Sequence, residues 1–342
     1  MIWLAWRQFR IQLLVTLAAI AALAIYLVFF GRGVHHFYDT QIAGCTGETC
    51  ANAQEVFNDK YFNESMLIGA ALLFLPALIG CFWGAPLIAR ELETGTHRLV
   101  WNQSVTRTRW LAVKLGFIAL FSLAVTGLLS LLLSWAAQPI DKLFGSRFGP
   151  MTFDSRDIAP LGYAVFAFIL GTTIGLLIRR TLPAMAVTLA IFIAVQIAMP
   201  TLIRPHLMSP ITSTVAFTSD FLENKQIDGI GSSGTSGGSS GDTTPVGIFG
   251  YNKPGAWVLS SPFHALLKAD GSAFTRVDMR SCMTGEQTRD GTCLASKNVH
   301  FNITYHPASR YWTFQWIETA IFLALALALA AVCFWRIPRG FS

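Results

Sequence analysis

The sequence predicts an all-α polytopic membrane protein with six transmembrane helices, and three observations lead to this fold class. Hydrophobic residues make up 53% of the 342 residues, and charged residues make up only 13%. Soluble domains carry about 25% charged residues, so this composition is typical of a membrane chain. Six separate stretches hold roughly 20 mostly apolar residues, the length that a helix needs to cross a bilayer. The backbone must satisfy its own hydrogen bonds in lipid, so each stretch is expected to be helical.

Residues 1–12, which precede the first apolar stretch, predict an amphipathic helix lying in the membrane interface. Ile2, Trp6 and Phe9 fall on one helical stripe, while Arg7 and Arg10 face away from it. Such a helix buries its apolar face among the lipid headgroups and holds its cations near the phosphates. The alternative is a simple basic flank that only sets the orientation of the first span.

The six predicted spans cover residues 13–30, 66–89, 111–137, 161–178, 182–203 and 316–335. Pro76, Pro86 and Pro200 predict kinks or helix ends within their spans, because proline lacks a backbone N–H. The domain organisation that follows is transmembrane helices 1–5 in residues 13–203, an outer module in residues 204–315, and the sixth helix with a cytoplasmic tail in residues 316–342.

The orientation of the spans follows from the placement of Lys and Arg. With the N-terminus in the cytoplasm, the inner segments hold eleven of the 25 Lys and Arg residues but only two of the 19 Asp and Glu residues. We therefore predict a multi-pass protein of the plasma membrane with both termini cytoplasmic. The net charge of +6 reflects this asymmetry across the membrane, so nucleic acid is not expected as a partner.

The cysteines give an independent check on this orientation. Cys45 and Cys50 fall in the first outer loop, and Cys282 and Cys293 fall in the last outer segment. Disulfides form and persist outside the reducing cytosol, so two local pairs on the outer side favour the bridges 45–50 and 282–293. The alternative is four free thiols.

The last outer segment, residues 204–315, is too long to be a connecting loop. Residues 229–242 are rich in Gly and Ser and predict a flexible linker. The part that follows contains aromatic and β-branched residues together with one cysteine pair. We interpret the segment as a small extracytoplasmic module that is partly β.

Polar residues inside the predicted spans are few. Ser122, Thr126 and Ser130 recur every four residues along the third span, where they either bond the preceding turn or line a pathway. Glu318 is the acid that lies clearly inside a span, and its position near the outer end fits either snorkelling to the interface or a functional role. These four residues are weak pathway candidates. The spacings Gly80–Gly84 and Gly171–Gly175 indicate close helix packing, within the chain or in a dimer.

Catalytic chemistry is not expected in this chain. The sequence contains no G-x-x-x-x-G-K-[ST] phosphate loop, no H-E-x-x-H pattern and no C-x-x-C pattern. All seven histidines fall in predicted loops, which argues against an intramembrane Ser–His protease. We predict no catalytic residue, cofactor or metal site.

Residues 84–116 form a basic polar block between the second and third spans. It contains ARELETGT at 89–96, VTRTRW at 105–110 and then Lys114. This block resembles the signature of ABC-2 type transporter permeases, which carry R-E-x-E-x-G-T, then V-[ST]-R, then a Lys that opens the third span. The start WLAWRQFR at 3–10 is similar to actinobacterial members, and the predicted topology also matches. The usual proline before the V-[ST]-R block is Ser104 here.

The resemblance implies that loop 84–110 holds a cytoplasmic coupling helix that docks on a separate ATPase subunit, which binds ATP and Mg. Its expected contact residues are Arg90, Glu91, Glu93, Gly95, Thr96, His97 and Arg98. Arg90 and Glu93 are three residues apart and can brace each other, and Gly95 suits the position after a helix C-terminus. The alternative is a solvated basic loop that only sets topology.

The function that the resemblance implies is the permease subunit of an ATP-driven exporter in a bacterial membrane. The expected partners are membrane lipid, the ATPase subunits and a second permease chain, identical or paired, in a 2+2 complex. Drug, peptide antibiotic and lipid are all open as substrates. A membrane sensor or scaffold, whose outer module binds a ligand and signals to a cytoplasmic partner, is the alternative.

Overall fold

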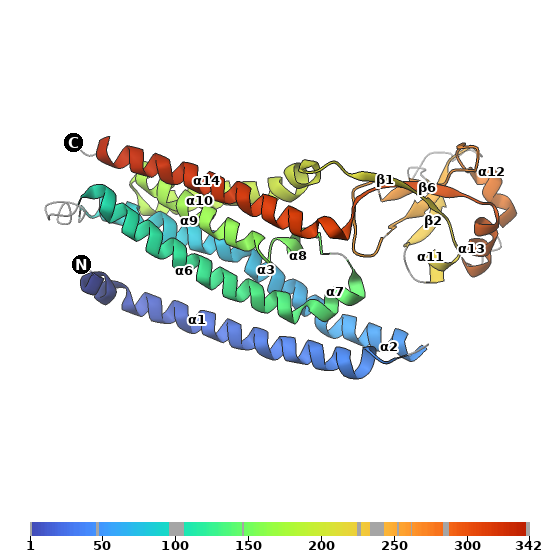
Figure 1. Ribbon diagram of the computed structural model, residues 1–342, viewed down its shortest axis with the longest axis horizontal. Helices are drawn as coiled ribbons and strands as arrows, with labels where there is room; N and C mark the ends of the chain where they lie inside the picture. Colours follow the sequence, from blue (N-terminus) through green and yellow to red (C-terminus); the bar gives the residue numbers. More distant parts are fainter. Residues whose placement is uncertain are drawn as a thin grey trace. The chain divides into compact units, whose positions relative to one another are not determined.

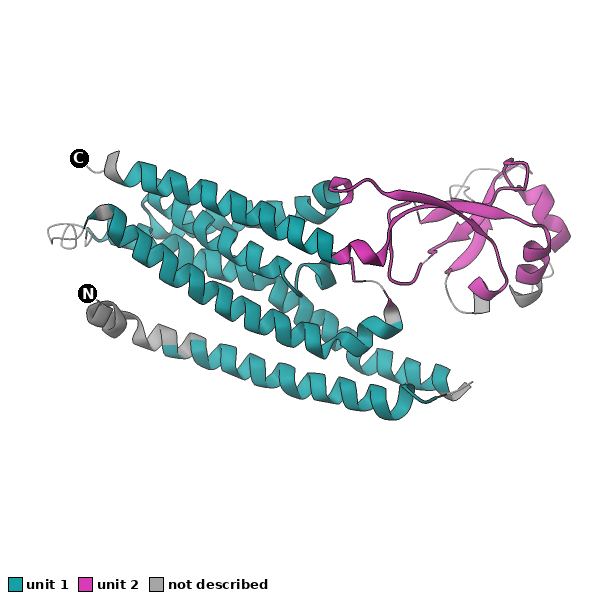
Figure 2. Ribbon diagram, viewed as in Figure 1, with its two compact units in different colours: residues 1–144, 149–204, 312–342 teal, residues 145–148, 205–311 magenta. Residues whose placement is uncertain are grey.

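The chain forms two compact units (Figure 2). The computed structural model describes residues 2–45, 48–95, 106–145, 147–223, 227–232, 243–251, 253–260, 262–282 and 287–339. Unit 1 comprises residues 1–144, 149–204 and 312–342, and unit 2 comprises residues 145–148 and 205–311. The second unit therefore falls largely within the segment interpreted from the sequence as an outer module.

Unit 1 is a bundle of long helices (Figure 1). Among the described residues, six helical stretches are long and apolar enough to cross a membrane. They are α1 (Ile2–Phe37) with η1 (Tyr38–Ile42); α2 (Glu48–Phe57), η2 (Asn58–Phe62), α3 (Asn63–Leu78), η3 (Ile79–Gly84) and α4 (Ala85–Glu93); α6 (Arg107–Ala136); α9 (Ala159–Ile178); α10 (Thr181–Ala198), η4 (Met199–Ile203) and η5 (Arg204–His206); and η7 (Ala308–Arg310) with α14 (Tyr311–Arg339). Two short helices, α7 (Gln138–Phe144) and α8 (Pro150–Phe153), lie between α6 and α9.

These helices confirm the predicted all-α membrane fold and extend the spans at their ends. Pro76 lies inside α3, and the helix widens into the π segment η3 three residues later. This is the kind of irregularity that a missing N–H produces. Residues 2–12 are helical and continuous with the first span, and their location in the membrane interface stays a prediction. Figure 1 shows that α1 begins and α14 ends at the same end of unit 1.

The prediction that all histidines lie in loops is wrong. His35 and His36 are in the last turn of α1, His264 is in a strand, and His300 and His306 begin and end another strand. Clusters of polar residues suggested loops, but helix α1 continues past its apolar part and the strands pair through backbone groups that any residue provides. His97 lies outside the described residues.

Helix α9 is the central helix of unit 1. In its most apolar window 78% of the residues are buried, whereas the corresponding share is 22% for α1. Glycines allow this burial, because a Cβ on Gly171 would lie 2.2 Å from the carbonyl oxygen of Gly80. A Cβ on Gly84 would lie 2.5 Å from the carbonyl oxygen of Phe168. The two predicted close-packing motifs thus pack against each other within one chain.

A separate apolar cluster joins α1 to α6 and the start of the second span. Leu27, Phe30 and Val34 of α1 pack with Leu129 and Leu133 of α6. The disulfide Cys45–Cys50 links the turn after η1 to α2, with a Cα–Cα distance of 5.1 Å. This bridge confirms the first predicted cysteine pair.

The described residues of unit 2 form two antiparallel three-stranded sheets, in the orders β1-β6-β4 and β2-β3-β5. The strands are β1 (Ile211–Ala216), β2 (Gly229–Ser232), β3 (Val246–Phe249), β4 (Trp257–Val258), β5 (Phe263–Ala265) and β6 (His300–His306). The longest ladder runs from Ile211 opposite Tyr305 to Ala216 opposite His300. The helical pieces are α11 (Asp220–Glu223), α12 (Arg276–Met279), η6 (Arg280–Cys282) and α13 (Gln287–Ser296).

Unit 2 has its own apolar core, in which Ile248, Leu266 and Phe301 are fully buried. The disulfide Cys282–Cys293 ties η6 to α13 beside this core and confirms the second predicted pair. Residues 229–232, predicted as the start of a flexible linker, instead form β2, because β3 supplies a backbone ladder for them. The rest of that linker, residues 233–242, lies outside the described residues.

Candidate functional site

The first candidate site is the polar end of α4, where the sequence places the coupling residues. Helix α4 ends at Glu93, and Gly95 follows with a φ of +70°. The N–H of Gly95 donates to the carbonyl oxygen of Leu92 at 3.4 Å. This left-handed residue confirms that Gly95 follows the helix C-terminus, as predicted, and its role in coupling stays a prediction. Thr96, His97 and Arg98 lie outside the described residues.

Helix α6, on the other side of this loop, begins with a side-chain cap. Thr106 is extended, with a φ of −67° and a ψ of 143°, and its hydroxyl accepts the N–H of Arg109 at 3.4 Å. A Thr or Ser in this position satisfies an N–H that the first helical turn leaves free. Thr106, the hydroxyl residue of the VTR sequence, is therefore the N-cap of α6.

Glu91 joins α4 to α6. Its carboxylate accepts a hydrogen bond from the ammonium group of Lys114 and forms an ion pair with it. The same ammonium lies 4.4 Å from the centre of the Trp110 ring. The two side chains are about a quarter exposed, at 26% for Lys114 and 28% for Glu91. These contacts give the lysine that opens the third span a partner across the loop.

Glu93 joins α4 to α10. Its Oε2 accepts hydrogen bonds from the N–H of Thr181 at 3.0 Å and from the Thr181 hydroxyl at 2.7 Å. Thr181 is the first residue of α10, so the carboxylate satisfies a free N–H at a helix N-terminus. Among the described residues Glu93 forms no ion pair with Arg90, and the predicted brace between them is wrong because Thr181 offers the better donors.

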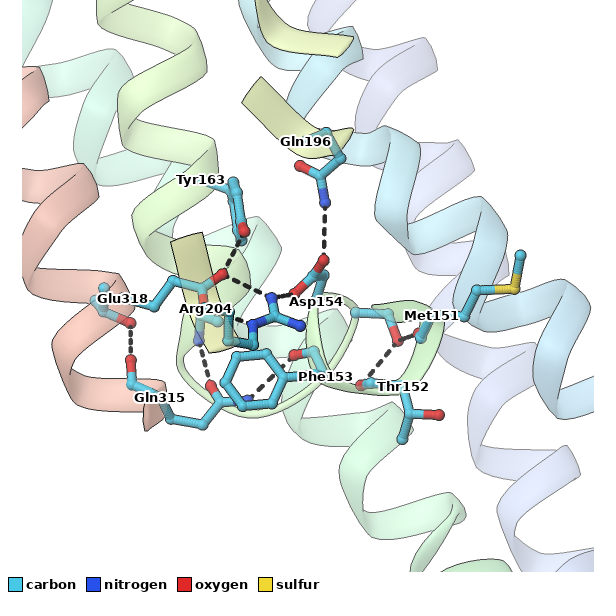
Figure 3. A network of polar contacts seen from close by, with 12 residues as sticks. Met151, Thr152, Phe153, Asp154, Tyr163, Gln196, Arg204, Gln315 and Glu318 are labelled. Atoms are coloured by element: carbon cyan, nitrogen blue, oxygen red, sulfur yellow. Dashed lines mark hydrogen bonds and ion pairs between the residues drawn. The ribbon is translucent and has the colours of Figure 1, made fainter. Parts of the chain in front are cut away.

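The second candidate site is a set of three charged residues that we call the charge cluster: Asp154, Arg204 and Glu318 (Figure 3). The guanidinium of Arg204 bonds Glu318 twice, from Nε to Oε2 and from Nη2 to Oε1, each at 2.8 Å. The same Nη2 also donates to Oδ1 of Asp154. The three side chains are at most 1% exposed. Glu318 is therefore an interior residue, and snorkelling to the interface does not describe it.

Neighbouring side chains add further hydrogen bonds to the charge cluster. The hydroxyl of Tyr163 in α9 donates to Oε1 of Glu318, and the amide of Gln196 in α10 donates to Oδ2 of Asp154 at 3.3 Å. The guanidinium of Arg204 lies 4.0 Å from the centre of the Phe153 ring. Asp154 lies outside the six apolar helices, and burial raises the pKa of its carboxyl to about 7, with Arg204 opposing the shift and Glu318 adding to it.

Asp154 belongs to the segment 149–158 between α7 and α9, which we call the connector. Five consecutive connector residues, 152–156, are buried. Gln315 of α14 bonds the backbone of the connector and of the first residue of α9. Its Oε1 accepts hydrogen bonds from the N–H groups of Ile158 and Ala159, and its Nε2 donates to the carbonyl oxygen of Phe153. Arg156 donates to Asp141 at 2.9 Å and to Ser65 at 3.2 Å. Backbone outside regular helices is thus satisfied by protein groups, as the inside of a membrane bundle requires.

The serines and threonine of the third span are also buried in protein. Ser122 bonds the carbonyl oxygen of Ile118 one turn back, and Ser130 bonds the carbonyl oxygen of Asp157 in the connector. The hydroxyl of Thr126 is buried, with no hydrogen-bond partner among the described residues. Ser130 therefore positions the connector, while Ser122 bonds within its own helix, the first of the two roles that the sequence allowed.

Sequence reasoning identified Glu318 but missed Asp154 and Arg204. Residue 204 is the first residue of the predicted outer module, and residue 154 lies between the third and fourth predicted spans. An acid inside a span usually pairs with another group, so Glu318 alone indicated that a buried cation should be near it. This rule does not identify Arg204 as the cation, because Arg204 is 114 residues away in sequence. No group of three or more His, Cys, Asp or Glu side chains that could hold a metal ion occurs in the described part of the chain.

Comparison with known proteins places the chain in a family. Residues 17–204, which include most of the first five spans, the loop after α4 and the connector, match the family described as ABC-2 membrane transporter related. Neither the curated proteins nor the solved structures contain a match. The match covers more than half of the chain and includes the signature block. The chain therefore belongs to the ABC-2 membrane transporter related family and is an ABC-2 type permease.

Proposed function

We propose that this permease is the transmembrane subunit of an ATP-driven exporter and that a separate cytoplasmic ATPase drives it through residues 84–110. Membership of the family supports the transporter, since such permeases generally work with an ATPase partner. The coupling route is supported by the contacts at the end of α4. ATP and Mg are bound by the partner subunit in this proposal, and the permease binds neither.

The observation that carries the proposal is that the end of α4 is attached to two other spans. Glu91 holds Lys114 of α6, and Glu93 holds Thr181 of α10. The close glycine contacts hold the same helical stretch against α9. A partner that displaces the end of α4 therefore moves three spans together, which is the kind of rigid-body motion that alternating access needs.

Arg90 is the residue through which docking is best tested. Glu91 and Glu93, which the resemblance implies as contacts of the ATPase, have partners inside the chain. Arg90 is exposed on the last turn of α4. Removing a charge-assisted contact weakens binding by about 1.5–3 kcal/mol, roughly ten- to a hundredfold.

The complete transporter in this proposal contains two permease chains and two ATPase subunits in a bacterial plasma membrane. Both chain termini and the loop 84–110 face the cytoplasm, and residues 205–311 face outward. The charge asymmetry of the sequence supports this orientation. The substrate is a drug, a peptide antibiotic or a lipid.

The test is co-purification followed by reconstitution. The tagged chain is purified with the ATPase subunit that accompanies it, and ATP hydrolysis is measured in vesicles with candidate drugs, peptides and lipids. We expect hydrolysis to be stimulated by the transported compound and stimulation to be lost in Arg90→Ala. Lys297→Ala, an exposed cation of unit 2, is the matched control and should behave as the unaltered protein.

Two results would contradict this function. One is the absence of any co-purifying ATPase. The other is a ligand that binds unit 2 without changing ATP hydrolysis. That result would favour the alternative function, a membrane sensor or scaffold. The observation that supports this alternative is that unit 2 has its own apolar core.

A further inference from the structure

The charge cluster contains more acid than base. Two carboxylates share the single guanidinium of Arg204, and both of them bond the same nitrogen, Nη2. With both acids ionised the cluster carries one net negative charge in a fully buried position. An uncompensated charge in a buried position is strongly unfavourable, so a carboxyl there takes up a proton instead.

Charged groups elsewhere around the connector do not balance this excess. Tyr163 faces the cluster from α9 as a neutral phenol and donates a hydrogen bond to Glu318. On the side of α3 and α7, Arg156 is paired with Asp141. The groups that α6 and α10 present to the connector are neutral: Ser130, Ser134 and Gln196. The proton is therefore the remaining way to bring the cluster to neutrality.

The hydrogen bonds indicate which carboxyl takes the proton. Both oxygens of Glu318 are taken up by donors, because it accepts one hydrogen bond from Tyr163 and two from Arg204. Asp154 accepts from Arg204 and from the amide of Gln196. An amide can bond either form of an acid, because its NH₂ donates to a carboxylate and its oxygen accepts from a carboxyl. Asp154 is the better proton carrier.

We propose that Asp154, Arg204 and Glu318 form a proton-binding latch, in which one proton on the carboxylate pair keeps the connector docked among the spans and its release to water favours undocking. The docked state is neutral, with Asp154 protonated and Arg204 paired with Glu318. In the undocked state both carboxylates reach water and are ionised. One proton passes to bulk water each time the connector leaves.

The latch would act on four of the six spans at once. The connector or the cluster is bonded by α9 through Tyr163, by α10 through Gln196, by α14 through Glu318 and by α6 through Ser130. Release of the connector would therefore free the ends of these helices together. The proposal does not depend on ATP-driven transport, so its test uses no transport assay.

The sign of the pH dependence follows from linkage. The pKa of Asp154 is about 7 in the docked state, and an exposed aspartate titrates near its usual value of about 3.9. Between these values undocking releases a proton, so the undocked fraction rises by up to about tenfold per pH unit. Above about pH 7 both states are deprotonated and the curve becomes flat.

The experiment measures the accessibility of the connector in the full chain in membrane vesicles. Ser155, which is 1% exposed, is replaced by cysteine, and the buried free thiols Cys81 and Cys333 are replaced by alanine. The rate of maleimide labelling is followed from pH 5 to pH 8. Met151→Cys, at a connector position that is already 49% exposed, reports the pH dependence of the reagent itself. The quantity compared is the ratio of the two rates.

We expect this ratio to rise from pH 5 to pH 7 and then to become flat. Asp154→Asn and Glu318→Gln each leave one neutral ion pair, so in both variants the ratio should stay low at every pH. A ratio that does not change with pH in the unaltered cluster overturns the proposal. A pH-dependent ratio that persists in both variants also overturns it. A ratio that is high at every pH in both variants overturns it too, because the cluster then only holds the connector in place and binds no proton.

Discussion

The end of α4 and the charge cluster both use ion pairs between helices, but they differ in exposure. The side chains of Lys114 and Glu91 are 26% and 28% exposed, whereas those of Arg204 and Glu318 are fully buried. A partly exposed pair exchanges easily with water and contributes about 0–1 kcal/mol. A buried pair contributes little when complete but is costly to break. The exposed pair at the end of α4 suits a surface that a partner protein moves. The buried charge cluster suits a site that holds the connector or releases it as a whole.

The largest expected effect is at Arg204. Arg204→Met leaves two buried carboxylates without their cation, and breaking a buried pair destabilises by about 3–5 kcal/mol. The triple variant with Asp154→Asn and Glu318→Gln removes the uncompensated charge and should recover most of this loss. Thermal unfolding of the purified chain in detergent measures both. Equal melting temperatures for the single variant and the unaltered chain would contradict the role of the cluster.

The next effect is at the glycine contact between α9 and the second span. In Gly171→Ala the added methyl group would meet the Gly80 carbonyl oxygen, so the helices must separate, at about 1–3 kcal/mol. Gly116→Ala is the control, because a Cβ there meets nothing within 4 Å, and alanine stabilises a helix by up to about 1 kcal/mol. Opposite shifts in melting temperature are expected. Equal shifts would show that the close approach is not essential.

An intermediate effect is expected on the stability of unit 2 as the pH falls. Burial lowers the pKa of His264 and of His306 below the usual value for histidine. The unfolded chain therefore binds protons more readily near pH 6.5, so stability is present above that pH and is lost as pH falls through the folded values. Calorimetry of the full chain should show the unit 2 transition moving to lower temperature between pH 7 and pH 5. The double variant His264→Gln, His306→Gln should reduce this movement, and an unchanged movement would contradict the assignment.

The smallest effect is at the exposed pair. Lys114→Ala should destabilise the chain by about 1 kcal/mol or less, and added salt should reduce the difference because exposed pairs are screened. Melting temperatures at low and high salt measure this. A loss as large as that of Arg204→Met would remove the contrast between the two regions.

Local features of this molecule were predictable from the sequence, and distant pairings were not. The spans follow from apolar runs, the helix end at Gly95 from one glycine, and the disulfides from separations of 5 and 11 residues. The partners of Glu318 and Asp154 depend on how α9, α10 and α14 pack, because Arg204 is 114 and 50 residues from them. Two glutamates in a basic loop suggested a partner surface, but their partners are Lys114 and Thr181, in helices that follow later in the sequence.

The most direct test of the central claim, that residues 84–110 couple this permease to an ATPase, compares proline at two similar glycines. Gly95 and Gly271 both have a positive φ, of +70° and +82°, and a Cβ at either meets nothing within 4 Å. Proline fixes φ near −65°, so each variant loses its local turn to a similar degree. The measurement is the affinity of the co-purifying ATPase for the two variants in detergent. Ten- to hundredfold weaker binding of Gly95→Pro, with normal binding of Gly271→Pro, is the result we predict, and equal binding of both would contradict the coupling role of this loop.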